Sequence, residues 1–271
     1  MAIYSIDQTP IGRSTHADGT AGAHIGYISR GGACPAIGAG GGLSTNAQEV
    51  QEWLSEQEQS DRKNARVVDK IMFALPRELT PEQRYELAHD YAKEISLERT
   101  LYFFAIHETG KDASNPHCHL VIRDRDIETG QKVIGFSDSK KQWKERGRDQ
   151  ESATHWIRER LEYKINEHLE KAGHSVRVDR RSLVAQRDEA LKRGEMQRAQ
   201  ELDRKAQIHV GVRAQKLAEK GIRPESNDNY RKTDKGRTRP EYNAEIISLN
   251  LEKQARSRDV SIRTRALFEK E

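Results

Sequence analysis

Short apolar runs alternate with amphipathic segments along the first half of the chain, and this pattern predicts interleaved strands and helices. Strands are expected where apolar residues alternate or form short runs rich in β-branched and aromatic side chains. They are predicted at residues 2–6, 66–75, 100–107 and 116–123. Helices are expected where apolar residues recur every three or four positions. They are predicted at residues 19–30, 44–64 and 80–95.

Capping and breaking residues refine these boundaries. The segment Thr80-Pro81-Glu82 has the features of a helix start: a capping hydroxyl, a proline in the first turn and an acid. The preceding helix is expected to be capped by Ser44 or Thr45. Residues 33–43 are rich in glycine, so we expect either a mobile linker or a flap beside the helix that carries Tyr27.

The pattern changes after Gly135, where amphipathic segments replace the strands. Helices are predicted at residues 139–172, 183–204, 214–220 and 244–270. Residues 223–243 contain two prolines and few apolar side chains, so we expect an extended or disordered segment there. The whole pattern predicts an α+β fold with helices on the faces of an antiparallel sheet, followed by a basic helical extension. We assign residues 1–200 to the first domain and residues 201–271 to the extension.

The charge balance differs between the two halves of the chain. Residues 1–138 hold 14 Lys and Arg against 20 Asp and Glu, whereas residues 139–271 hold 33 against 23. The basic second half indicates a polyanionic partner, and ordinary solvated helix faces are the alternative. No N-terminal segment resembles a signal peptide, and no apolar run has the length of a membrane span. We therefore expect a cytoplasmic protein without membrane insertion.

Three of the ten histidines, His107, His117 and His119, fall on the predicted hairpin of residues 100–107 and 116–123. Side chains at positions i and i+2 of a strand share a face, so His117 and His119 point the same way. His107 ends the neighbouring strand and can reach the same point. Three neutral imidazoles leave coordination positions open on a divalent ion, which is typical of catalytic metal sites. The spacing therefore predicts a metal site.

The nucleophile is less clear from the residues themselves. No Gly-x-Ser-x-Gly motif and no His-x-His-x-Asp pattern is present. Either a metal-activated water or one of the eight tyrosines remains open as the attacking group.

Residues Asn115–Leu120 (NPHCHL) resemble the His-hydrophobic-His motif of HUH endonucleases, with Cys118 as the middle residue. The Asn-Pro in front is similar to mobilisation relaxases of the MobA/MobL type. Further stretches that resemble this family, in its order, are residues 1–4, 23–30 (AHIGYISR), 73–79 (FALPREL) and 172–182. One position departs from the pattern: many members carry an acid in the strand before the Ala-Leu-Pro turn, where this chain has Met72, with Asp69 three residues earlier.

The resemblance implies an HUH relaxase fold that is circularly permuted relative to replication initiators. It implies that Tyr27 is the catalytic nucleophile and that His107, His117 and His119 hold Mg²⁺ or Mn²⁺, with Zn²⁺ as an alternative. The implied reaction is site- and strand-specific nicking of DNA at a plasmid's origin of transfer. Attack by Tyr27 would give a 5′-phosphotyrosyl intermediate that is later religated.

The implied partners are single-stranded and hairpin DNA at the origin of transfer, accessory relaxosome proteins and secretion-channel coupling proteins. Long basic side chains near the site and in the basic half are candidate phosphate contacts. We select Arg13, Arg30, Lys140, Lys141, Arg180 and Arg181.

Three other functions compete with this interpretation. A rolling-circle replication initiator uses the same chemistry, but its tyrosine follows the His-x-His, as Tyr163 would here. A non-catalytic nucleic-acid-binding protein would use the histidines for structural zinc. A metallohydrolase would attack with water and would not need Tyr27.

Overall fold

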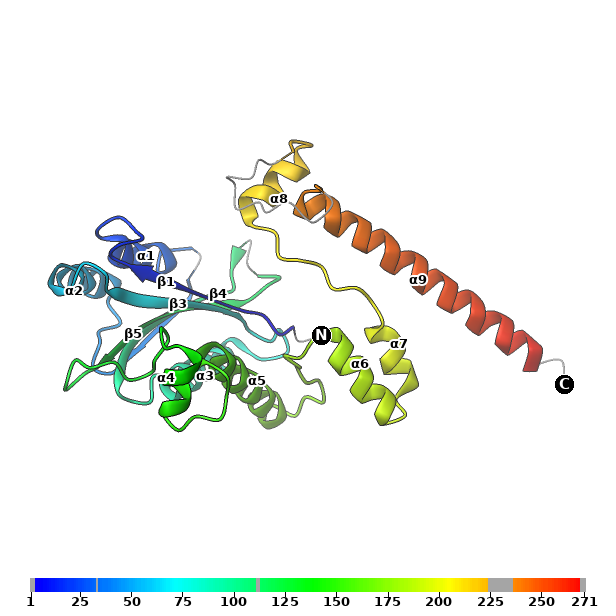
Figure 1. The fold of residues 1–271 in the computed structure, drawn as a ribbon, viewed down its shortest axis with the longest axis horizontal. Helices are drawn as coiled ribbons and strands as arrows, with labels where there is room; N and C mark the ends of the chain where they lie inside the picture. The colour runs from blue at the N-terminus through cyan, green and yellow to red at the C-terminus, as the bar shows by residue number, and fades with distance from the viewer. Residues whose placement is uncertain (1–2, 33, 111–112, 224–235, 269–271) are drawn as a thin grey trace. The chain divides into compact units, whose positions relative to one another are not determined.

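The computed structural model describes residues 3–32, 34–110, 113–223 and 236–268. The chain divides into two compact units, Met1–Arg180 and Arg181–Glu271. The first unit is built around a five-stranded antiparallel sheet with the strand order β1-β3-β5-β4-β2 (Figure 1). Its strands are β1 (Ile6–Gly12), β2 (Ala36–Gly40), β3 (Arg66–Ala74), β4 (Thr100–His107) and β5 (His117–Asp126). The expected α+β class and the hairpin of β4 with β5 are confirmed.

Helices cover both faces of this sheet (Figure 1). One face carries α1 (Thr20–Ile28) and α2 (Ala47–Ser60), and the other carries α3 (Pro81–Ile95), α4 (Lys140–Glu145) and α5 (Ala153–Lys171). Successive side chains of a strand point to opposite faces. In β4, Phe103 and Ala105 therefore pack with α1 and α2, whereas Phe104 and Ile106 pack with α3 and α5. His107 continues the first series and faces α1.

The first strand lies further along the chain than predicted, at residues 6–12 instead of 2–6. This strand contains Pro10, which cannot donate a backbone hydrogen bond to a sheet. β1 is an edge strand, however, and an edge strand tolerates proline. Its position is set by pairing with β3, in which Ile6 lies opposite Phe73.

The glycine-rich segment is also different from the prediction, since its centre forms the other edge strand, β2, paired with β4. Gly38 lies opposite Phe104, and Gly40 lies opposite Tyr102. A Cβ atom at either glycine would come within 2.2 Å of the opposing ring. The glycines therefore leave space for two aromatic rings, which is a packing role that composition alone does not reveal.

Several helix ends differ from the prediction for local reasons. The cap of α2 is Asn46, which accepts hydrogen bonds from the backbone of Gln48 and Glu49, so Ser44 and Thr45 lie outside the helix. The helix predicted at 139–172 is divided into α4 and α5. Gly147 lies between them with a φ of 72°, a left-handed conformation that commonly ends helices.

In the second unit, the helix predicted at 183–204 is divided in the same way at Gly194, which has a φ of 72°. The helices are α6 (Leu183–Lys192), α7 (Met196–Leu202), α8 (Val212–Glu219) and α9 (Arg239–Phe268). Of the segment expected to be extended, residues 224–235 lie outside the described residues, and α9 already begins at Arg239. In the described part of the chain, no helix has the length and apolar character of a membrane span.

A buried ion pair links Asp61, at the end of α2, to Arg123 in the sheet. The guanidinium of Arg123 in β5 donates to both carboxylate oxygens of Asp61 at 2.9 and 3.0 Å, and also to the carbonyl of Val67. Both side chains are about nine-tenths buried. We predict that Asp61→Ala lowers the free energy of unfolding by about 3–5 kcal/mol, because it leaves a buried cation without its partner.

Urea denaturation measures this loss, and the exposed pair of Lys93 with Glu98 provides a matched control. Glu98→Ala should cost less than about 1 kcal/mol. Equal losses in the two variants would contradict a special role for the buried pair.

Candidate metal and nucleophile site

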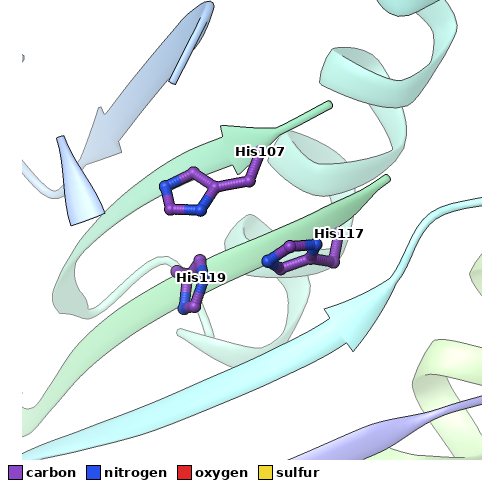
Figure 2. Close-up of side chains that lie close together, drawn as sticks. All are labelled: His107, His117 and His119. Carbon is purple, nitrogen blue, oxygen red and sulfur yellow. The ribbon is translucent and has the colours of Figure 1, made fainter. Parts of the chain in front are cut away.

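The facing ends of β4 and β5 bring three imidazoles together on the sheet face that α1 covers (Figure 2). The ring centroids of His107 and His119 are 4.5 Å apart, those of His117 and His119 are 4.9 Å apart, and those of His107 and His117 are 5.3 Å apart. One nitrogen from each ring lies within 4.8 Å of the others. We call these residues the histidine triad. Its geometry suits a single divalent cation.

Backbone carbonyls orient two of the three rings. Nε2 of His107 lies 2.6 Å from the carbonyl oxygen of Ile28, and Nδ1 of His117 lies 2.9 Å from that of Asn115. A carbonyl only accepts hydrogen bonds, so each of these nitrogens carries the proton. The other nitrogen of each ring, Nδ1 of His107 and Nε2 of His117, is left with a lone pair for an ion. Such carbonyl partners are typical of metal-binding histidines.

The third ring is kept neutral by its surroundings. Burial, followed by the charges of the other two triad histidines, lowers the pKa of His119 to about 3. Neutral imidazole is the form that binds metal ions. The His119 ring is therefore in the form that binds a cation at neutral pH.

Tyr27 lies near the end of α1, and its side chain is 56% exposed. The guanidinium carbon of Arg30 is 4.1 Å from the centroid of the Tyr27 ring, and the same guanidinium donates to the Tyr27 carbonyl at 2.8 Å. On the other side along the helix, the ring of His24 stacks with Tyr27 at 6.2 Å between centroids. The phenol is thus accessible and is flanked by a cation and an imidazole.

Two links connect the tyrosine helix to the histidine triad. The first is the hydrogen bond between His107 and Ile28, the residue that follows Tyr27. The second is the ring of His24, which is 6.4 Å from that of His119. Sequence reasoning missed His24. The available signal was its position three residues before Tyr27, which places both side chains on one helix face.

Asp69, the acid three residues before Met72, does not lie on the same face of the sheet as the histidine triad. Asp69 and Met72 are three positions apart in β3, so they point to opposite faces of the sheet. Met72 pairs in register with His119 and shares its face, whereas Asp69 is buried on the other side, where it accepts hydrogen bonds from Arg66 and Gln8. The metal-capable cluster found among the described residues consists of the three histidines and contains no carboxylate.

The six candidate phosphate contacts are scattered. Arg30 adjoins Tyr27, while Arg13 follows β1 and donates to the backbone carbonyl of Asp61. Arg180 is held by Glu159 and Glu162 at 3.3 and 3.0 Å.

The remaining three candidates also lie on other elements. Lys140 and Lys141 belong to α4, which packs on the sheet face opposite the histidine triad. Arg181 begins the second unit. Of the five candidates in the first unit, Arg30 is the one that contacts Tyr27.

The alternative nucleophile Tyr163 is 52% exposed and lies on α5, which also covers the face opposite the triad. Tyr27 lies on α1, on the triad's side of the sheet, and precedes the His-x-His in the chain. Tyr91 is excluded as a nucleophile because it is fully buried and donates to the carbonyl of Ile157.

Comparison with known proteins identifies relatives of this chain. Mobilization protein A of Escherichia coli is 31% identical over an alignment of 211 residues, which covers 72% of this chain and 26% of that protein. A 43 kDa relaxation protein of Salmonella typhimurium is 31% identical over an alignment of 156 residues, which covers 52% of this chain and 42% of that protein. The chain thus spans about a quarter of the length of the first relative and less than half of the length of the second.

A solved structure described as the molecular basis of vancomycin resistance transfer in Staphylococcus aureus has the same fold. The TM-score is 0.51 at 23% sequence identity, and the match covers 67% of this chain and all of that one. The family model described as MobA/MobL family matches residues 44–220, well over half of the chain. The resemblance inferred from Asn115–Leu120 is confirmed, and the chain belongs to the MobA/MobL family.

Proposed function

We propose that this chain is a relaxase that nicks one DNA strand through Tyr27. The observation that carries the proposal is the connection of the tyrosine helix to the histidine triad, through the His107–Ile28 hydrogen bond and the His24 ring. A phenol and a metal-ligand set from distant parts of the chain are thereby held on one face of one sheet. A closed structural zinc site would normally have four protein ligands, whereas the triad supplies three.

His107, His117 and His119 would hold the divalent cation, which supplies charge neutralisation and orientation of the scissile phosphate. Mg²⁺ or Mn²⁺ is the proposed ion, and Zn²⁺ also suits imidazole ligands. The carbonyls of Ile28 and Asn115 keep two of the imidazoles in the tautomer that binds a cation.

The phenolic oxygen of Tyr27 attacks the phosphorus in line with the leaving 3′ oxygen. The new bond joins tyrosine to the 5′ phosphate, the phosphorus–O3′ bond breaks, the phenol loses its proton, and the 3′ oxygen gains one. Arg30 holds the ring from one side, with its guanidinium over the ring, while the stacked ring of His24 supports the other side. The phosphodiester energy is retained in the adduct, so the strand can later be rejoined.

The biological role that follows is plasmid mobilisation. The relatives are named for mobilisation and relaxation, and they are considerably longer than this chain. We therefore propose single-stranded and hairpin DNA at an origin of transfer as the substrate, with relaxosome and secretion-channel coupling proteins as partners. We keep residues 1–200 as the proposed catalytic domain and residues 201–271 as its extension.

An adduct assay with end-labelled DNA tests the reaction. The full chain is incubated with Mn²⁺ and single-stranded oligonucleotides that tile the DNA around its own coding sequence. We expect an oligonucleotide labelled at its 3′ end to transfer its label to the protein on a denaturing gel. The same oligonucleotide labelled at its 5′ end should give a shorter, free product that ends in a 3′-hydroxyl.

The two labels separate the proposal from a hydrolase and from a structural metal site. Cleavage of both oligonucleotides without label on the protein would indicate a hydrolase and overturn the proposal. Tight zinc binding with no cleavage of any oligonucleotide would favour a structural metal site instead.

A further inference from the structure

The turn after α4 holds a cation whose hydrogen-bonding capacity is unused by the described part of the protein. The guanidinium carbon of Arg148 lies 4.6 Å from the ring centroids of both Trp143 and Trp156. Trp143 is fully buried and Trp156 is 8% exposed, so both indoles are fixed in the core. Cation–π attraction to two fixed rings restricts the guanidinium to a narrow range of orientations.

No described side chain or carbonyl bonds the five N–H donors of this guanidinium. The two carboxylates whose charges act on Arg148 are used elsewhere. Asp124 accepts four backbone hydrogen bonds from the segment 133–136. Asp138 binds Lys132 and Arg146. Burial and the charge of Arg146 lower the pKa of Arg148, which is the effect expected for a cation that lacks a counter-ion.

Three lysines of α4 add to this positive charge. Lys140, Lys141 and Lys144 line an open hollow of about 670 Å³, together with Glu145 and Glu151. The ion pairs of Lys140 and Lys141 are long and exposed, at 3.3 and 3.9 Å, so they contribute little and are easily exchanged. Lys144 is exposed and has no ion-pair partner within the described residues.

We propose that Arg148, Lys140, Lys141 and Lys144 form a contact surface for the phosphodiester backbone of DNA, on the sheet face opposite the histidine triad. A planar guanidinium with free donors matches a phosphate, and the flexible lysines of α4, the helix just before Arg148, add charge without demanding a base sequence. The DNA bound here is a segment away from the scissile phosphate, because the triad lies on the other face. This inference rests on the proposed function.

Salt-dependent binding of a fluorescein-labelled single-stranded oligonucleotide to the full chain tests the surface. We expect Arg148→Gln and Lys144→Gln each to weaken binding about 5-fold near 0.1 M salt and to lower the slope of log affinity against log salt by about 0.7. Lys93→Gln is the control, because it also removes the charge of an exposed lysine, which lies on α3 outside the hollow and pairs with Glu98 at 3.5 Å. Lys144→Gln leaves the two tryptophans untouched, so it tests the surface even if Arg148→Gln disturbs the core.

Each outcome bears on the inference. Weaker DNA binding by both variants, with a smaller slope of log affinity against log salt, supports the DNA-contact surface. This holds even if the unaltered chain forms no covalent adduct and the proposed function fails. If the unaltered chain forms the adduct normally but Arg148→Gln and Lys144→Gln bind DNA as tightly as Lys93→Gln does, the proposed DNA-contact surface is wrong and the proposed function stands. Absence of DNA binding by the unaltered chain overturns both proposals.

Discussion

Replacing Tyr27 with phenylalanine should abolish the covalent protein–DNA adduct, with a loss of more than about 10³-fold, because the substitution removes the attacking oxygen. The ring remains, so its contacts with Arg30 and His24 are kept and the fold should be unaffected. DNA affinity should stay within a factor of about two, since the phenolic oxygen of an exposed side chain contributes little to backbone recognition. Transfer of a 3′-end label to the protein on a denaturing gel measures the adduct.

Tyr163→Phe is a closely matched control for this experiment. Tyr163 is exposed to a similar degree, at 52% against 56%, and the guanidinium of Arg160 lies 4.6 Å from its ring. It differs from Tyr27 in lying on α5, away from the triad. The control should form adduct like the unaltered chain. If Tyr163→Phe lost the adduct and Tyr27→Phe kept it, Tyr163 would be the nucleophile. The tyrosine would then follow the His-x-His in the chain, as it does in replication initiators.

The histidine triad could be predicted because its geometry is local. The two-residue period of a strand places His117 and His119 on one face, and the antiparallel pairing of β4 with β5 brings His107 beside them. The register of β4 with β5 pairs His107 directly with His117. Every element of this argument lies within thirteen consecutive residues, so no knowledge of the remaining fold was needed.

Two features that sequence reasoning missed depend on contacts between distant segments. β2 is a strand because Gly38 and Gly40 accommodate aromatic rings of β4, more than sixty residues away. His24 approaches His119 because α1 packs on the sheet, and no local period encodes that distance. Such positions are set by tertiary packing, which overrides local patterns.

Removing a triad ligand should weaken metal binding more than removing any nearby histidine. His119 has the pKa most strongly lowered by its surroundings, and its ring is the closest of the three to both partners, at 4.5 and 4.9 Å. We predict that His119→Ala lowers the affinity for Mn²⁺ by more than about 100-fold, since loss of an outer hydrogen-bond partner alone costs about 10–100-fold. Calorimetric titration of the full chain measures this, and the same variant should form no adduct.

His24→Ala is the control for a histidine that lies near the metal site without being a ligand. The ring of His24 is 6.4 Å from that of His119, and His24 is outside the triad. The variant should bind Mn²⁺ with nearly unchanged affinity, while its adduct forms more slowly because one support of the Tyr27 ring is lost. An unchanged Mn²⁺ affinity in His119→Ala would show that the triad is not the metal site. A loss in His24→Ala as large as that in His119→Ala would make His24 a fourth ligand. In that case α1 would have to move toward the strands when the ion binds, and the Tyr27 helix would itself belong to the metal site.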